Sequence, residues 1–194
     1  MLMLRADSPI RTFKEFLADA RAKPGKLSAG YGSAGSQVSL AMLKSMGKLD
    51  VVEVPYKGIP QTVTDVLGGT LSFTFVDLGN ALAQAKGGKL RGLAVTSAKR
   101  TPLAPDVPAV AEELKGYELI AWFALMAPAG TPPDIVQRLH DVTVKGIATA
   151  EVKEKFAAIG TDVAPMNQAE LAKFIQSEIA HWAKLVKLAG IQPE

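Results

Sequence analysis

The sequence predicts an α/β fold with a largely parallel sheet that is flanked by helices. Short apolar runs alternate with segments whose apolar residues recur every three or four positions, and glycine or proline separates most of these segments. Each strand–helix repeat of this kind places a helix against one face of a parallel sheet. The chain has 194 residues and is 48% hydrophobic, which is ample for a packed core.

The first 125 residues carry the regular alternation. Thr12 is placed to cap the first helix, and Pro24-Gly25 is placed to end it. We expect strands at 2–5, 26–30, 51–56, 71–76 and 90–96, and helices at 13–23, 36–47, 59–67 and 78–85. In such a sheet, ligands bind beyond the carboxyl ends of the strands.

The remainder of the chain has a different pattern. An extended apolar run at 118–127 is long enough to cross between two lobes, and the residues after it read mainly as helix, with a long final helix at 168–188 and one short strand at 162–164. We therefore divide the chain into a ligand-binding lobe, 1–125, and a helical part, 126–194.

A glycine- and serine-rich turn, residues 30–36, is the strongest candidate for a binding site. It joins a predicted strand to a predicted helix and contains Gly30, Gly32, Ser33, Gly35 and Ser36. Glycines bring backbone N–H groups close to a ligand, and the start of a helix offers unpaired donors at the positive end of its dipole. The turn is therefore suited to a phosphate or a carboxylate.

Two further strand ends belong to the same edge of the sheet. Tyr56 would supply an aromatic wall with a hydroxyl group, and Lys57 would add a positive charge. Asp77 directly follows an apolar strand and precedes a helix, so it is placed either to cap that helix or to contact a ligand.

Two enzyme-like alternatives match parts of this turn. Residues 30–35 have the G-x-G-x-x-G spacing of a dinucleotide site, but the next strand ends in Pro-Tyr-Lys, and its only acid, Glu53, lies mid-strand. Residues 31–35 match the G-x-S-x-G motif of a nucleophile elbow except at one position, with Ser33 as the nucleophile. A complete motif would make the chain an α/β-hydrolase. That motif lacks its first glycine, and His140 and His181 both fall inside helical patterns.

Composition argues against several other classes. The net charge of +3 comes from 22 basic and 19 acidic residues without a basic cluster, so nucleic acid is not an expected partner. The sequence contains no cysteine and no cluster of His, Asp and Glu at ligand spacing, so we expect no metal and no cofactor. No segment has the length of a membrane span, and Met1–Arg5 does not have the pattern of an export signal.

An ordered set of local motifs resembles the Bug/TctC family, the extracytoplasmic solute receptors of tripartite tricarboxylate transporters. The motifs are Gly32-Ser33-Ala34-Gly35-Ser36, Val54-Pro55-Tyr56-Lys57-Gly58, Leu67-Gly68-Gly69, Gly88-Lys89-Leu90-Arg91, Leu93-Ala94-Val95-Thr96-Ser97, Asp106-Val107-Pro108 and Ala127-Pro128-Ala129-Gly130-Thr131-Pro132. Together they cover nearly the whole chain.

The resemblance implies a lobe of a type II periplasmic binding protein, with a partial second lobe at the C-terminus. Such a receptor is not an enzyme: it closes on a small carboxylate in the periplasm and delivers it to a membrane permease. The ligand-binding residues that it implies are Gly32, Ser33, Ala34, Gly35, Ser36, Tyr56 and Asp77. The ligand-sensing domain of a transcription regulator shares this architecture and is a further alternative; for that class we would expect a helix-turn-helix segment before the lobe, and the 194 residues do not contain one.

The chain departs from the family pattern in two ways. Ser39-Leu40 stands where the family usually has His-Leu, and we expect the first-lobe loop that clamps the other side of the ligand to lie outside these 194 residues. We therefore expect roughly the last two-thirds of a receptor, with weak binding. We also expect a homodimer in which the C-terminal helices bury the apolar residues Ile135, Leu139, Phe156 and Trp182 against a second copy.

Overall fold

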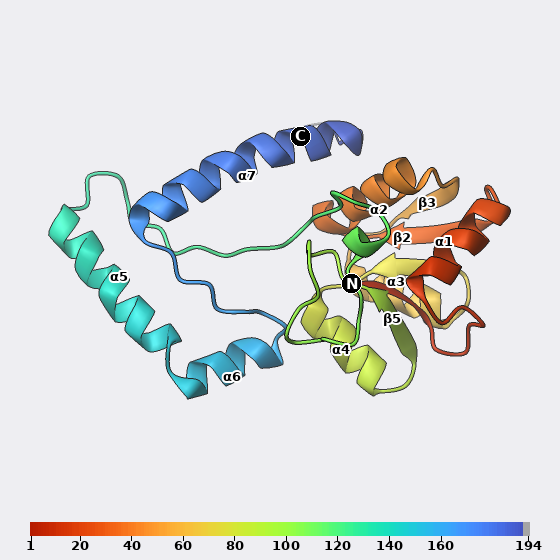
Figure 1. Ribbon diagram of the computed structural model, residues 1–194, viewed down its shortest axis with the longest axis horizontal. Helices are drawn as coiled ribbons and strands as arrows, with labels where there is room; N and C mark the ends of the chain where they lie inside the picture. Colours follow the sequence, from red (N-terminus) through yellow and green to blue (C-terminus); the bar gives the residue numbers. More distant parts are fainter. Residues whose placement is uncertain (192–194) are drawn as a thin grey trace.

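A five-stranded sheet lies at the centre of the N-terminal lobe (Figure 1). The computed structural model describes residues 1–191. The strands are β1 (Leu2–Arg5), β2 (Leu27–Tyr31), β3 (Val51–Pro55), β4 (Phe73–Phe75) and β5 (Leu90–Ala94), in the order β3-β2-β4-β1-β5. β2 pairs in parallel with β3 and β4, whereas β1 runs antiparallel between β4 and β5. The predicted α/β fold with a mostly parallel sheet is confirmed.

Different helices bury the two faces of the sheet. The helices are α1 (Phe13–Ala22), α2 (Ala34–Gly47), α3 (Ile59–Leu67) and α4 (Leu78–Lys86). Residues of α1 and α2 form one apolar cluster, and residues of α3 and α4 belong to the other. β1 contributes Leu2 and Leu4 to the first cluster and Met3 to the second, because successive strand residues point to opposite faces, and Met1, just before β1, also belongs to the second cluster.

Capping side chains decide where two of these helices begin. Thr12 Oγ1 accepts a hydrogen bond from the amide of Glu15 at 3.1 Å, which confirms the predicted cap of α1. α2 begins at Ala34 rather than at the expected Ser36, because Ser33 caps this helix in the same way.

Tyr117 holds the segment that follows β5 against α2. Its side chain is fully buried, and its hydroxyl donates a hydrogen bond to the carbonyl oxygen of Ser39 at 2.8 Å. Burial raises the pKa of Tyr117, so the phenol remains protonated. Between β5 and Tyr117 the chain forms a single 3₁₀ turn, η1 (Val110–Glu112).

The C-terminal helices form an arm that extends away from the lobe (Figure 1). They are α5 (Pro133–Ile147), α6 (Ala150–Ala158) and α7 (Gln168–Leu188). α5 and α6 contain no buried residue, whereas Leu185 near the end of α7 is buried in the cluster of α1 and α2. The prediction of a strand at 162–164 is wrong: these residues form no regular element and pair with no strand of the described chain.

A second contact joins the arm to the lobe. A Cβ atom on Gly79, at the start of α4, would lie 2.4 Å from the carbonyl oxygen of Ile159, and one on Gly160 would lie 2.2 Å from the amide nitrogen of Gly79. Only glycines allow backbones to approach this closely, and Gly160 also has a φ of +74°. The arm therefore contacts the lobe at the end of α6 and at the end of α7. The division into 1–125 and 126–194 remains a prediction.

Within residues 1–191, no helix combines the length and the apolar character that crossing a membrane requires.

Candidate functional site

The candidate residues lie in loops and in the first turn of α2, at one edge of the sheet. Tyr31 of β2 pairs with Pro55 of β3, and Gly30 of β2 pairs with Thr74 of β4. The loops that begin at Gly32, Tyr56 and Val76 therefore leave the parallel strands at nearly the same level. This is the carboxyl edge, where ligands of parallel sheets bind.

The turn between β2 and α2 is closed by its own serine side chains. Ser36 Oγ accepts hydrogen bonds from the amides of Gly32 and Ser33, at 3.1 and 3.0 Å, and the amide of Ser36 donates to Ser33 Oγ at 3.2 Å. The expectation that this whole set of amides faces a ligand is therefore wrong for these three. The amides of Ala34 and Gly35 have no acceptor within the described part of the chain.

The two remaining donors occupy a favourable position. Ala34 and Gly35 form the first turn of α2, and Ala34 is exposed. Both N–H groups contribute to the partial positive charge at the start of a 14-residue helix. These two donors can hold the two oxygens of one carboxylate. The site therefore has fewer available amide donors than the sequence pattern suggested.

Gly32 holds the β2–α2 loop against the β3–α3 loop. A Cβ atom at Gly32 would lie 2.3 Å from the carbonyl carbon of Gly58 and 2.7 Å from the amide nitrogen of Ile59. The amide of Tyr56 also donates to the carbonyl oxygen of Tyr31 at 2.8 Å. Direct backbone packing therefore fixes the position of the first turn of α2.

The hydroxyl of Tyr56 is engaged with α3. It donates a hydrogen bond to the carboxylate of Asp65, and this bond raises the pKa of Tyr56. Tyr56 and Asp65 line a shallow hollow of about 300 Å³ together with Gln61 and Thr64. The structure therefore shows Tyr56 at the predicted edge, but with its hydroxyl already partnered.

Asp77 presents an exposed carboxylate at the same edge. It occupies the N-cap position of α4, but its side chain makes no capping hydrogen bond, so the simple capping role considered for it is not observed.

The α-amino group of Met1 is buried next to this edge and donates to the carbonyl oxygen of Val76 at 2.8 Å. Burial lowers the pKa of this amine to about 5, although the negative charge of Asp77 acts in the opposite direction.

Buried threonines below the loops were not foreseen. Thr74 Oγ1 lies 2.9 Å from the carbonyl oxygen of Gly30 and 2.9 Å from Thr62 Oγ1, and Thr62 donates to the carbonyl oxygen of Ile59 at 2.8 Å. Both threonines are fully buried. They join β2, β4 and α3 directly below the edge. The sequence feature that could have indicated this contact is Thr62, a polar residue on the apolar side of the predicted helix at 59–67.

Neither enzyme-like alternative gains support. Ser33 Oγ contacts the amide and hydroxyl of Ser36, whereas the ring of His140 contacts Asp141 and the Met166 carbonyl oxygen, and His181 contacts a backbone carbonyl oxygen. Ser33 therefore has no histidine within hydrogen-bonding distance in the described residues. For the dinucleotide alternative, Glu53 forms an ion pair with Lys44 of α2. Within residues 1–191 no three His, Asp or Glu side chains gather as a metal site would require.

The family of the chain follows from comparison with protein-family models. The model of the tripartite tricarboxylate transporter family receptor, TctC, matches residues 1–191. The chain belongs to the TctC family. This confirms the resemblance that the ordered motifs indicated.

Relatives and solved structures agree with this assignment. The chain is 33% identical to a UPF0065 protein from the tcbD-tcbE intergenic region of Pseudomonas sp. strain P51, over 96% of this chain and 56% of that protein. It is also 33% identical to BugT of Bordetella pertussis, over 90% of this chain and 54% of BugT.

Among solved structures, an R. palustris protein with adipate superposes with a TM-score of 0.85 at 29% identity, over 100% of this chain and 66% of that one. MatC of Rhodopseudomonas palustris with bound malate gives a TM-score of 0.76 at 27% identity, over 96% and 65%. This TctC-family chain thus spans somewhat over half the length of the curated relatives and about two-thirds of the solved structures that it matches.

Proposed function

We propose that the chain is the ligand-binding part of a periplasmic receptor for a small carboxylate, which delivers its ligand to a tripartite tricarboxylate-type transporter. The observation that carries this proposal is a pair of amides, those of Ala34 and Gly35, which have no acceptor within residues 1–191 and lie at the start of α2, at the carboxyl edge of the sheet. Family membership and two neighbours that were solved with adipate and malate support it. The TctC family is one of receptors, and we propose no catalytic step.

The site residues would contact different groups of the ligand, according to the charge of each residue. The amides of Ala34 and Gly35 would donate to a ligand carboxylate, with Ser33 beside them. Asp77 carries a like charge, so it would repel a carboxylate placed close to it and suits a hydroxyl or ammonium group elsewhere on the ligand. Tyr56 would act as an aromatic wall rather than as a donor, because its hydroxyl is bound to Asp65.

The number of available donors suggests weak binding. A hydrogen bond to a charged group contributes about 1.5–3 kcal/mol, so two such bonds contribute roughly 3–6 kcal/mol. A Kd of 1 mM corresponds to about 4 kcal/mol. We therefore infer millimolar binding for this chain by itself.

A proline substitution tests the site without disturbing the helix. Ala34→Pro removes one of the two amide donors, and proline is favoured at the first position of a helix. The preceding Ser33 has φ −158° and ψ 159°, which is the extended conformation that a following proline requires. Gln168→Pro is the matched control, because Gln168 is the first residue of α7 and also follows an extended N-cap residue, Asn167.

The assay is a titration with adipate, malate and citrate, followed by NMR of the backbone amides. We expect the Gly35 amide signal to shift on titration, Ala34→Pro to weaken binding about tenfold through loss of one bond, and Gln168→Pro to bind as the unmodified chain does. Equal affinity of Ala34→Pro and the unmodified chain would contradict the assignment of the site. Absence of any shift at tens of millimolar ligand would contradict carboxylate binding by this chain.

The partners of the chain follow from the same proposal. A membrane permease would receive the ligand, and a second copy would cover the exposed faces of the arm. In α5, Ile135 and Leu139 are 44% and 49% exposed, so the described chain itself does not cover the stripe that the sequence predicts to be buried.

A further inference from the structure

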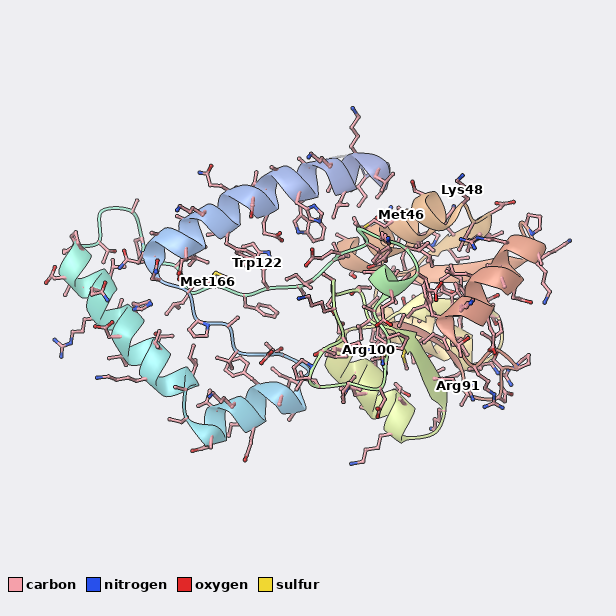
Figure 2. The ribbon with its side chains drawn as sticks, in the orientation of Figure 1. Met46, Lys48, Arg91, Arg100, Trp122 and Met166 are labelled. Atoms are coloured by element: carbon pink, nitrogen blue, oxygen red, sulfur yellow. The ribbon has the colours of Figure 1, made fainter. Side chains whose placement is uncertain are left out.

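Two hydroxyl groups are buried in the lobe directly below the candidate site. Thr62 of α3 and Thr74 of β4 each have an exposed fraction of 0%. Figure 2 shows side chains crowded around the sheet of the lobe and spaced apart on the arm, so these hydroxyls lie in the closely packed part of the chain. Burial of a hydroxyl is unfavourable unless it is hydrogen-bonded, and valine has a similar shape without that cost. A role in filling space alone would therefore favour valine over threonine at both positions.

The two hydroxyls connect three elements of the lobe. Thr74 Oγ1 lies 2.9 Å from the carbonyl oxygen of Gly30 in β2 and 2.9 Å from Thr62 Oγ1. Thr62 Oγ1 donates in turn to the carbonyl oxygen of Ile59, the first residue of α3, at 2.8 Å. Each hydroxyl has a single proton, so Thr74 donates either to Gly30 or to Thr62, while Thr62 donates to Ile59. Replacing Thr74 by valine therefore removes the contact between elements and leaves the hydroxyl of Thr62 with a partner.

The absence of a side chain at Gly30 allows this contact. A Cβ atom on Gly30 would lie 2.5 Å from Leu71 Cδ1 and 3.0 Å from both Cβ and Cγ2 of Thr62. The helix α3 therefore packs directly on the backbone of β2, and Thr62 occupies space that a side chain of β2 would otherwise fill. This close packing accounts for the first glycine of the G-x-G-x-x-G spacing, which contributes no donor to the amide pair of the site.

The carbonyl groups that the threonines bind belong to the two loops that meet at Gly32. Gly30 precedes Gly32 by two residues, and a Cβ atom on Gly32 would lie 2.7 Å from the amide nitrogen of Ile59. A change in the distance between β2 and α3 would therefore shift Gly32 and, with it, the first turn of α2. Hydrogen bonds weaken when the donor no longer points at its acceptor, so this distance also sets how well the amides of that turn hold a carboxylate.

We propose that Thr62 and Thr74 are positioning residues of the carboxylate site, whose hydroxyls set the distance between β2 and α3 and thereby the direction of the amides at the start of α2. The ligand does not contact them, because both are fully buried below the loops. Hydrogen bonds suit this role because they fix both a distance and a direction, whereas apolar burial is non-directional. The inference rests on the carboxylate site proposed above.

Valine and serine variants separate the hydroxyl group from the methyl group. Thr74→Val and Thr62→Val each remove one hydroxyl and keep the shape, whereas Thr74→Ser keeps the hydroxyl and removes a buried methyl group. Tyr117→Phe is the matched control, because it also removes a buried hydroxyl bond, one that ends at Ser39, beyond the first turn of α2. Thr74→Ser and Tyr117→Phe are both expected to melt below the unmodified chain, so an effect of stability alone would appear in these two as well.

NMR of the backbone amides gives two readouts on the full chain. In a titration with adipate, malate and citrate, we expect both valine variants to bind roughly threefold or more weakly, and Thr74→Ser and Tyr117→Phe to bind within about twofold of the unmodified chain. Without ligand, we expect hydrogen exchange at the amides of Gly32 and Ser33, which donate to Ser36 Oγ, to be faster by roughly threefold or more in the valine variants alone.

Three results overturn the proposal. They are unweakened binding by either valine variant, equal weakening in the valine variants and in Tyr117→Phe, and weak binding by Thr74→Ser, which would make the shape of the side chain decisive instead of its hydroxyl. If the unmodified chain binds none of the three carboxylates, the function proposed above fails. Hydrogen exchange then decides this inference separately, because unchanged exchange at Gly32 and Ser33 in Thr74→Val shows that the threonines do not hold the loop.

Discussion

Replacing Gly32 by alanine separates the role of a glycine in loop packing from its role in backbone conformation. Gly32 does not adopt a positive φ, so backbone strain does not require glycine there. Lack of space requires it instead, because an added Cβ would lie 2.3 Å from the carbonyl carbon of Gly58, whereas carbon atoms pack at about 3.5–4.0 Å. The β3–α3 loop must therefore move by roughly 1 Å.

Gly35→Ala is a matched substitution three positions along the same turn. Its added Cβ would have only Ser33 Oγ nearby, at 3.9 Å, and Gly35 already lies in helix α2. Overpacking typically costs about 1–3 kcal/mol, so Gly32→Ala is expected to lower the melting temperature by roughly 3–10 °C. Gly35→Ala is expected to raise it by about 1–3 °C, because alanine is the better helix former.

Thermal unfolding followed by circular dichroism at 222 nm measures both variants under the same conditions. A ligand titration adds a second readout, since displacement of this loop would also move the amides of Ala34 and Gly35. If Gly32→Ala melts at the same temperature as the unmodified chain, or higher than Gly35→Ala, the backbone contact with Gly58 does not fix the loop.

Further predictions concern contacts outside this turn. Gly79→Ala would push the turn after α6 away from α4, and we expect faster proteolysis between α6 and α7, with Gly146→Ala, which meets nothing within 4 Å, as the unaffected control. Tyr117→Phe removes one buried hydrogen bond, and urea unfolding should show a loss of about 1 kcal/mol. Asp65→Asn removes the carboxylate that stabilises the protonated phenol of Tyr56. The pKa of Tyr56 should therefore fall toward its ordinary value, which absorbance at 295 nm during an alkaline titration detects; an unchanged titration curve would contradict the bond.

The sequence by itself determined the strands and helices of the lobe and the position of the candidate site. These features depend on short-range rules, namely the apolar period, a capping residue such as Thr12 and the glycines that end helices. The prediction for the helix at 59–67 matches α3, and that for 168–188 matches α7. Both have strong apolar periods bounded by glycine or asparagine.

Only the tertiary structure decided which donors in the candidate site are available. A glycine–serine turn before a helix predicts unpaired amides, but a serine hydroxyl can satisfy such amides itself, and the choice depends on side-chain rotamers. The amides of Gly32 and Ser33 donate to Ser36 Oγ, so only the amides of Ala34 and Gly35 remain available to a ligand at this turn in the described chain. The same holds for Tyr56, whose hydroxyl bonds to Asp65 of the next helix.

Long-range pairing also lay beyond the sequence pattern. An apolar run such as 118–127 reads as a strand whether or not another strand lies beside it, because periodicity records side-chain burial and not hydrogen-bond partners. In the structure β1 pairs with β4 and β5, whereas residues 120–127 pair with no strand of the described chain. Which strands pair is a property of the whole arrangement, because the partner's position is set by residues far away in sequence.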